Sequence, residues 1–338
     1  MRPDSDTILV ADDVSVRFPI GAGMFGRGGV SLTAVDHVSF SLKAGESLAI
    51  VGESGCGKTT LGMACAGLST PTEGRILVEG VDIAGIGRRE RHRMRRRLQV
   101  VFQDPMSSLN PKMRVGDIVA EPLVVHRIGS AASRRERVAY LLSRVGLAPD
   151  YAQRFPHELS GGQRQRVGIA RALATEPRLI IADEPVSALD ISIKAQIINL
   201  LADLRDEFNL SFLVVSHDFS IVEYLCDNVA VMYLGKIVEF GPTESVLRAP
   251  RHPYTQSLLD SIPDARDPER AFSLPDIGEL PSPLNPPAGC GFHPRCPRAL
   301  EICARVAPAP VAPLPGTMVR CHLFGAEGAA APTFQEPA

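Results

Sequence analysis

Residues 46–68 place a glycine-rich loop between a short apolar segment and a run of good helix formers. The segment ESLAIVG (46–52) is apolar enough for a buried parallel strand, and TTLGMACAGL (59–68) favours a helix. Between them, GESGCGKT (52–59) fits the pattern G-x4-G-K-S/T. Glycine lets the backbone curl so that successive N–H groups face an anion, and the helix N-terminus adds partial positive charge. The segment predicts a phosphate-binding loop on a parallel sheet.

The side chains of this loop suit a nucleoside triphosphate held with Mg²⁺. Lys58 can reach the β- and γ-phosphates, and the Thr59 hydroxyl can ligate Mg²⁺. A chance glycine-rich turn is the alternative, but it explains neither the strand before the loop nor the helix after it. The predicted nucleotide contacts in the loop are Gly52, Ser54, Gly55, Cys56, Gly57, Lys58, Thr59 and Thr60.

A second short apolar run, LIIADE (179–184), ends in two carboxylates. Asp183, at the end of a buried strand beside the phosphate loop, can hold Mg²⁺ through water. Glu184 can orient or activate the attacking water. Such a strand on its own often only marks the chain leaving the core. Together with the phosphate loop, it predicts a site of nucleotide hydrolysis.

Further periodic segments complete the expected α/β pattern. FLVVSH (212–217) predicts another buried strand, and the apolar stripe of 190–208 predicts a helix. In 133–146, Ser133 and Glu136 form a capping box at the start of an expected helix. Strands that alternate with helices imply a parallel sheet covered on both faces.

The segment LSGGQ (159–163) opens another helix and carries a double glycine. Ser160 is a good N-cap, and the two glycines leave backbone N–H groups open to an anion. An ordinary capped helix start does not require two glycines. A second phosphate-binding helix start, far along the chain from the first, suggests that two chains clasp one nucleotide. The residues predicted for this role are Ser160, Gly161, Gly162 and Gln163.

These motifs occur in one order with Gln103 in VVFQDP, SALD (187–190) and His217 in VVSHD. Over residues of about 10–240 the chain resembles the ATP-binding subunit of ABC transporters. The resemblance implies the α/β fold of a P-loop NTPase: a parallel sheet flanked by helices, an antiparallel β subdomain and a helical subdomain at about 104–172. It also implies a head-to-tail dimer in which each ATP site pairs Gly52–Thr60 with Ser160–Gln163 of the partner.

The same resemblance assigns roles to single residues. Gln103 would sense Mg²⁺ and connect to the membrane subunits, and His217 would contact the γ-phosphate and support Glu184. Asp190 would lie at the dimer seam. Phe18, in VSVRFPI, is the candidate aromatic for stacking on adenine, although a lone Phe is more often a core residue. The predicted Mg²⁺ ligands are Thr59, Gln103 and Asp183.

Several segments resemble the ATPases of oligopeptide and dipeptide importers, namely 104–123, 249–263 and the tail CGFHPRCPRALEIC with RCHLF. This implies a second ATPase subunit, different or identical, two transmembrane permeases, and indirectly an extracytoplasmic solute-binding protein. The chain would then work at the cytoplasmic face of the cell membrane, with 103–121 contacting the permeases. Closely similar ATPases energise import of nickel or other solutes, so the cargo stays open.

Composition limits the other functional classes. The 338 residues carry a net charge of −2, which argues against a dedicated nucleic-acid binder, and no apolar run reaches the ~18–20 residues of a membrane span. The start of the chain lacks a signal-peptide pattern. RRERHRMRRR (88–97) is expected to be a solvated helix face, with contact to anionic lipid as the alternative. A soluble ABC protein acting on DNA or ribosomes commonly carries two cassettes, whereas this chain has one phosphate loop.

The predicted domains are an ATPase unit at 1–240 and a Pro- and Cys-rich extension at 241–338. Cys56, Cys65 and Cys226 are expected to be packing residues. In a cytosolic protein, clustered cysteines suggest metal binding more than disulfides. Resemblance to cluster-holding ATPases predicts a 4Fe–4S cluster, with reduced thiols or zinc as alternatives. Its ligands would be Cys290, Cys296, Cys303 and Cys321.

Overall fold

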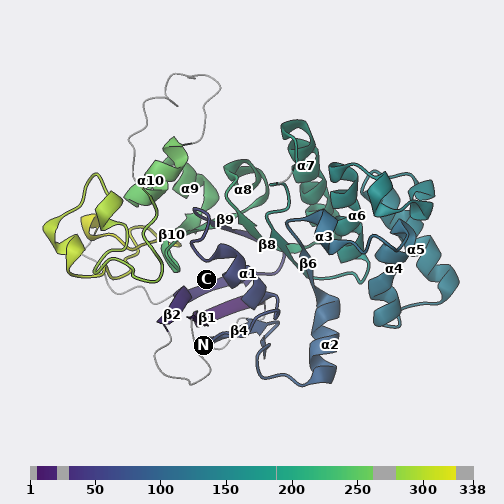
Figure 1. The fold of residues 1–338 in the computed structure, drawn as a ribbon, viewed down its shortest axis with the longest axis horizontal. Helices are drawn as coiled ribbons and strands as arrows, with labels where there is room; N and C mark the ends of the chain where they lie inside the picture. Colours follow the sequence, from purple (N-terminus) through teal and green to yellow (C-terminus); the bar gives the residue numbers. More distant parts are fainter. Residues whose placement is uncertain (1–5, 21–29, 188, 262–278, 325–338) are drawn as a thin grey trace.

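The computed structural model describes residues 6–20, 30–187, 189–261 and 279–324, and its centre is a seven-stranded sheet (Figure 1). The strand order is β11-β10-β9-β3-β8-β7-β6, and the five strands from β9 to β6 run parallel. Two antiparallel strands, β10 and β11, complete one edge. The bounds are β3 Ser47–Val51, β6 Leu98–Val101, β7 Leu179–Asp183, β8 Ser211–Ser216, β9 Asn228–Tyr233, β10 Lys236–Pro242 and β11 Met318–Val319.

The central strands are buried on both faces, which is why they read as continuous apolar runs. Alternate residues enter two separate cores. Ala49 and Val51 of β3 face the core that holds α6 (Gly161–Leu173), α7 (Ile191–Phe208) and α8 (Phe219–Leu225). Leu48 and Ile50 face the core that holds α1 (Lys58–Cys65) and a second sheet. The predicted parallel sheet covered on both faces is confirmed.

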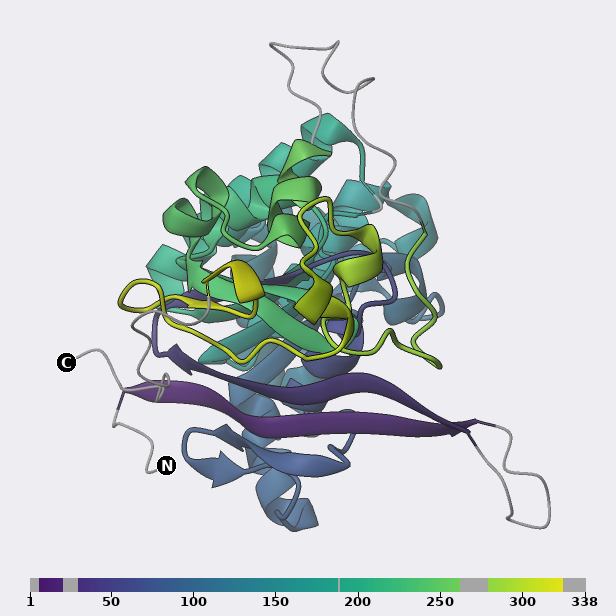
Figure 2. The ribbon, with the colours of Figure 1, turned by 90° about the vertical axis from the view of Figure 1, so that its left-hand side faces the viewer.

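The second sheet is antiparallel and lies beneath α1, where Figure 2 shows its two long strands crossing under the central sheet. Its order is β2-β1-β4-β5. The strands are β1 Thr7–Ile20, β2 Val30–Lys43, β4 Glu73–Val78 and β5 Val81–Asp82. This sheet matches the antiparallel β subdomain that the fold class predicted, and it carries Phe18 near the end of β1 opposite Leu32.

Helices α3 to α6 form a separate group at one end of the molecule in Figure 1. The first three are α3 Pro105–Ser108, α4 Val115–Val125 and α5 Ala131–Arg144, and they pack with α6. The sequence placed the start of α5 at a capping box on Ser133, which is wrong. The N-cap is Ser130, whose Oγ accepts a hydrogen bond from the Ser133 N–H at 3.2 Å. In the described ranges, no helix combines the length and apolarity that a bilayer crossing requires.

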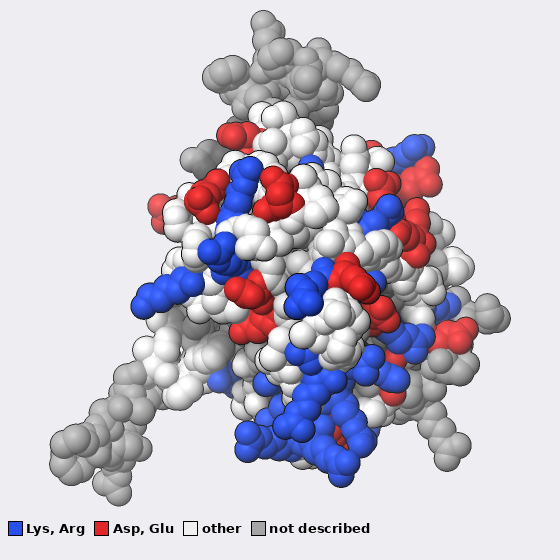
Figure 3. Space-filling view, turned by 90° about the vertical axis from the view of Figure 1, so that its right-hand side faces the viewer, with Lys and Arg blue, Asp and Glu red and all other residues white. Residues whose placement is uncertain are grey.

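The arginine run forms α2 (Arg88–Arg97), and Figure 3 shows its basic side chains gathered on the surface. Met94 is the one buried residue of this helix. Arg97 and the nearby Arg178 both pair with Glu79. The structure agrees with the expected solvated helix face.

Beyond β10, the chain packs back onto the central sheet. It forms α9 (Thr243–Arg248) and α10 (Pro253–Asp260), then short 3-10 turns, and returns as β11 beside β10. Tyr254 and Phe292 are fully buried, and their rings meet that of Tyr233 from β9. Aromatic packing therefore joins this region, which is poor in regular structure, to the sheet that carries the phosphate loop.

His252 connects this region to acid stability. The ring is 1% exposed, its Nδ1 accepts a hydrogen bond from the Tyr254 N–H at 3.0 Å, and burial lowers its pKa to about 4. Between pH ~6.5 and 4, the His252 ring is protonated in the unfolded chain but stays neutral in the folded chain. The free energy of unfolding therefore falls as the pH drops from 6.5 towards 4. The full effect is about 3 kcal/mol.

His252→Asn, which keeps an N-cap, should flatten the slope of unfolding free energy against pH in denaturant titrations. An unchanged slope would contradict the assignment of this pH dependence to His252.

Candidate nucleotide site

The phosphate loop lies between β3 and α1, as the motif predicted, and its conformation requires glycine. Gly52 and Gly57 have φ values of 154° and 106°. A Cβ at Gly52 would lie 2.2 Å from the Met232 carbonyl oxygen, and one at Gly57 would lie 2.0 Å from that of Ala34. Both positions are therefore closed to any side chain, because neighbouring backbone occupies the space.

Lys58 spans the loop that it helps to form. Its side chain is nearly buried, and Nζ donates to the carbonyl oxygens of Gly52 and Glu53, each at 2.8 Å. The ammonium is thus held over the concave side of the loop, where a phosphate would meet both charge and backbone N–H groups. Cys56 differs from its neighbours, since its thiol is buried and its pKa is raised by that burial. Only its backbone can face a ligand. Cys65 and Cys226 are also buried, so the expected packing role of all three is confirmed.

Thr59 and Asp183 meet beside the loop. The Thr59 hydroxyl donates to Oδ1 of Asp183 at 3.2 Å, although the two residues come from α1 and the end of β7. Burial raises the pKa of the Asp183 carboxyl, and the neighbouring Glu184 adds to the rise. A hydroxyl and a carboxylate are the oxygen donors that Mg²⁺ prefers, so this pair fits the predicted metal.

Glu184 is held in an unusual backbone conformation next to His217. Its φ is 48°, in the left-handed region, and its N–H donates to the Val215 carbonyl at 2.8 Å. Nδ1 of His217 lies 2.9 Å from Oε1 and 2.7 Å from Oε2 of Glu184. A non-glycine residue in this region stores strain, which clusters at functional sites. The predicted partnership of Glu184 and His217 is present.

The LSGGQ segment forms the predicted capped helix start, on the surface. Ser160 Oγ accepts from the Gln163 N–H at 3.3 Å, while Gln163 Oε1 accepts from the Ser160 N–H at 2.9 Å. A Cβ at Gly162 would lie 2.6 Å from Cγ2 of Ile193, so α7 leaves no room there for a side chain. In Figure 1, α6 belongs to the helical group at one end and α1 to the centre. One chain therefore does not bring this segment to its own phosphate loop.

The remaining predicted residues occupy the rim of the site. Gln103 is exposed just beyond β6, at the same sheet edge as Asp183, because β6 and β7 are parallel neighbours. Asp190 is exposed as the N-cap of α7, with no side-chain capping hydrogen bond. Phe18 is 42% exposed, so it is not a core residue. Of the SALD motif, Ala188 lies outside the described residues.

The sequence did not reveal two residues that contact the phosphate loop from the C-terminal region. The Tyr254 hydroxyl accepts from the Glu53 N–H at 2.8 Å, and the Arg295 guanidinium binds the Glu53 carboxylate. HPY (252–254) served only as a family resemblance, and no spacing rule connects Arg295 with the loop.

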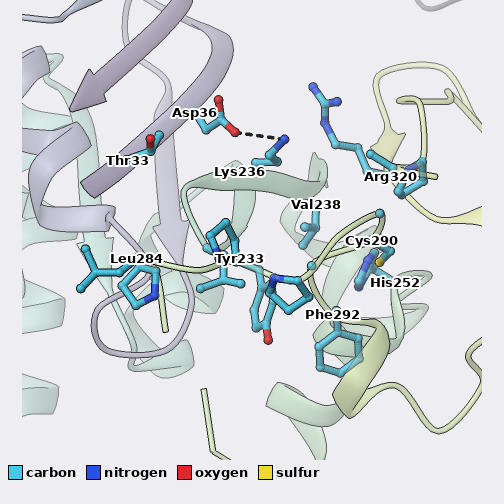
Figure 4. Close-up of a pocket in the computed structure, with 18 of the residues that line it drawn as sticks. Thr33, Asp36, Tyr233, Lys236, Val238, His252, Leu284, Cys290, Phe292 and Arg320 are labelled. Atoms are coloured by element: carbon cyan, nitrogen blue, oxygen red, sulfur yellow. Dashed lines mark ion pairs between the residues drawn. The ribbon is translucent and has the colours of Figure 1, made fainter. Parts of the chain in front are cut away.

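A cavity of about 260 Å³ adjoins the loop on the side of β2 (Figure 4). Ala34 and Gly235 both contact the loop. The Ala34 carbonyl oxygen lies against Gly57, and the Gly235 N–H donates to the Cys56 carbonyl at 2.9 Å. Their neighbours Thr33 and Leu234 line the cavity. Lys236 and Asp36 pair at 3.0 Å across its upper wall in Figure 4, and the C-terminal region closes the other side with Leu284 and Phe292, among others.

The structure does not support a metal site at the four C-terminal cysteines. None of the four forms a disulfide, and the Cys290 N–H donates to the Cys303 carbonyl at 2.8 Å. Burial raises the pKa values of Cys290, Cys296 and Cys321, and the other thiols nearby add to this rise. Within the described ranges, however, no three His, Cys, Asp or Glu side chains converge as metal ligands. The predicted 4Fe–4S cluster is therefore not supported.

Comparison with protein families gives two matches. Residues 35–187 match the model described as ABC transporter, and residues 238–303 match that described as oligopeptide/dipeptide transporter, C-terminal region. The first match contains the phosphate loop, the LSGGQ helix start and the two carboxylates. The second contains Tyr254 and Arg295.

Whole-chain relatives and solved structures agree with these matches. The oligopeptide transport ATP-binding protein AppF of Bacillus subtilis is 51% identical, with 95% of this chain and 98% of AppF covered. The di/tripeptide transport ATP-binding protein DppF of Pseudomonas aeruginosa is 43% identical, covering 94% and 98%.

Among solved structures, a dimeric ATP-binding cassette bound to ADP and phosphate after hydrolysis is 30% identical, with a TM-score of 0.63. It covers 70% of this chain and 99% of its own. The cassette cbiO1 of Clostridium perfringens is also 30% identical, with a TM-score of 0.62 over 72% and 92%. The phosphate loop, the paired carboxylates and the C-terminal region together place this chain in the ABC transporter family, as an ATP-hydrolysing, ATP-binding subunit of the oligopeptide/dipeptide type.

Proposed function

We propose that this chain hydrolyses ATP to energise the import of peptides, as a peripheral subunit at the cytoplasmic face of the cell membrane. Similarity across nearly the whole chain to oligopeptide and di/tripeptide transport proteins, including the C-terminal region, carries the proposal. An ATPase for nickel or another solute is the alternative, because the ATPase itself does not touch the cargo. These relatives give no support to a protein acting on nucleic acid or ribosomes.

In the proposed site, the triphosphate lies along the concave side of the phosphate loop. Lys58 and the backbone N–H groups of the loop bind the β- and γ-phosphates, and Thr60 at the start of α1 lies beside the α-phosphate. Phe18, exposed on β1, stacks on adenine. Thr59, Asp183 and, at the end of β6, Gln103 are the residues that would hold Mg²⁺. When bound, Mg²⁺ neutralises charge that develops on the phosphate oxygens.

Glu184 acts on the attacking water in this proposal. Its carboxylate lies beside the end of β7, where the strained backbone and the Val215 contact fix its direction. His217 orients the carboxylate through the Nδ1 contact. The rest of the imidazole ring is exposed and can contact the γ-phosphate. The carboxylate takes a proton from the water as the water oxygen bonds to the γ-phosphorus. The bond from that phosphorus to the bridging oxygen breaks, and ADP and phosphate are released.

Two chains complete each site in the proposed assembly. The exposed helix start at Ser160–Gln163 of one chain covers the phosphate loop of the other, with Asp190 at the seam. Support comes from the separation of α6 and α1 within one chain, and from the dimeric cassette among the structural relatives. The second ATPase is either a different or an identical subunit. Two permeases and, indirectly, a solute-binding protein complete the transporter, with residues 103–121 as the proposed contact to the permeases.

Reconstitution tests the cargo. The chain, its partner ATPase and both permeases are placed in vesicles with the solute-binding protein, and uptake of labelled dipeptide, tripeptide and Ni²⁺ is compared with and without ATP. ATP-dependent peptide uptake is the expected result. Uptake of Ni²⁺ alone would overturn peptide import while leaving the ATPase assignment intact.

A further inference from the structure

Arg295 in the C-terminal region makes a bidentate ion pair with Glu53 in the phosphate loop. Nη1 lies 2.8 Å from Oε2 and Nη2 lies 2.8 Å from Oε1. The side chains of Arg295 and Glu53 are 7% and 24% exposed, so water screens this pair weakly. Paired charge-assisted hydrogen bonds of this kind fix geometry as well as contributing energy. The contact thus fixes the direction of the Glu53 side chain.

Tyr254 holds the backbone of the same loop residue. Its hydroxyl accepts from the Glu53 N–H at 2.8 Å, and its ring is fully buried. The Glu53 carbonyl already accepts from Lys58 Nζ at 2.8 Å. The N–H, the carbonyl and the carboxylate of Glu53 are therefore all bound, two of them by the C-terminal region.

The groups that hold Glu53 are themselves rigidly supported. The ring of Tyr233 lies 4.6 Å from that of Tyr254 and 5.4 Å from that of Phe292, measured between centroids. The Tyr233 hydroxyl accepts from Arg295 Nη1 at 3.3 Å. Tyr233 ends β9, which pairs directly with the strand that leads into the loop. The support thus runs from the central sheet to both contacts on Glu53.

We propose that Arg295 and Tyr254 are positioning residues for ATP binding, and we name this pair the phosphate-loop latch. A loop binds phosphate well only when its N–H groups already converge, and the latch fixes the second residue of the loop, next to Gly52 and Ser54. Docking of the C-terminal region and binding of ATP are therefore coupled, and each strengthens the other by the same factor. This inference rests on ATP binding by the family and not on which solute is carried.

Steady-state ATPase kinetics of the assembled transporter test the latch. Arg295→Ala should raise KM for ATP by about 5–150-fold, the range of a typical coupling between sites, with a much smaller change in kcat. Tyr254→Phe, which deletes one hydroxyl, should raise KM in the same direction. The matched control is Arg298→Ala, because Arg298 is exposed in the same segment and bonds to Gln256 rather than to the loop. A merely structural role would reduce the amount of active enzyme, and so lower kcat without moving KM.

A double-mutant cycle separates the pair from general damage. Glu53→Gln and Arg295→Ala should each raise KM, and the double variant should be no worse than the poorer single variant, since both remove one interaction. Fully multiplicative effects would overturn the latch. An unchanged KM in Glu53→Gln would also overturn the latch. This variant makes the mildest change, so it still tests the latch if Arg295→Ala does not fold.

Hydrogen exchange measures the coupling from the other side. With the non-hydrolysable analogue AMP-PNP, amides of 290–303 should exchange more slowly than without nucleotide, and Glu53→Gln should abolish this protection. Protection that is equal in Glu53→Gln and the unsubstituted chain would refute the coupling. Because the assay needs no transported solute, its failure would leave the proposed peptide import untouched.

Discussion

Glu184→Gln is expected to lower ATP turnover by roughly 100-fold or more while ATP binding is retained. Glutamine keeps the shape of the side chain and can still hydrogen-bond His217, but it cannot accept the proton of the attacking water. The measurement is phosphate release by the assembled transporter at saturating ATP, together with equilibrium binding of a fluorescent ATP analogue. Binding should stay within a few-fold of that of the unsubstituted chain.

The matched control for this experiment is Glu223→Gln on α8. Glu223 is exposed and lies outside the site, so its turnover should not change. Turnover by Glu184→Gln within a few-fold of normal would refute the role of Glu184 as the base. Loss of ATP binding in the same variant would instead assign Glu184 to nucleotide binding.

Lys58→Ala is expected to weaken ATP binding by about 100-fold or more. Lys58 Nζ supplies charge-assisted hydrogen bonds to the phosphates, and each contributes roughly 1.5–3 kcal/mol. The substitution also removes the two contacts to the Gly52 and Glu53 carbonyls, so the loop loses support from within. Equilibrium binding of ATP with Mg²⁺ measures the effect.

Lys112→Ala is the control for this substitution, because Lys112 is an exposed lysine in the helical group, far from the loop in sequence. It should bind ATP normally. Thermal unfolding of Lys58→Ala without nucleotide shows whether the fold persists. A well-folded variant with normal ATP affinity would contradict the proposed path of the triphosphate along the loop.

Local patterns predicted the elements that carry the site. The runs at 46–52, 179–183 and 212–217 correspond to β3, β7 and β8, because a buried parallel strand leaves a continuous apolar signature. The stripe of 190–208 corresponds to α7. The start of α5 was misplaced by three residues, since Ser130 and Ser133 are both good caps and only the backbone decides which one accepts the hydrogen bond.

Contacts between distant segments left no such signature. Glu53 and Arg295 are each ordinary charged residues in the sequence, and only the return of the chain beside β9 and β10 brings them together. The cysteine spacing predicted a metal site that the described residues do not support. Nearby thiols add to the raised pKa values of Cys290, Cys296 and Cys321, yet closeness alone does not provide the convergent geometry that a metal requires.

The short strand β11 has a consequence for how the chain behaves in solution. Met318 and Val319 pair with Phe240 and Glu239 of β10, and the Arg320 N–H donates to the Val238 carbonyl at 2.8 Å. These few residues cap the margin of a largely apolar sheet. A chain cut before Met318 would expose the backbone N–H and C=O groups of β10, and exposed edge strands pair with strands of other molecules. Residues 318–320 thus protect the edge of the central sheet from pairing with strands of other molecules.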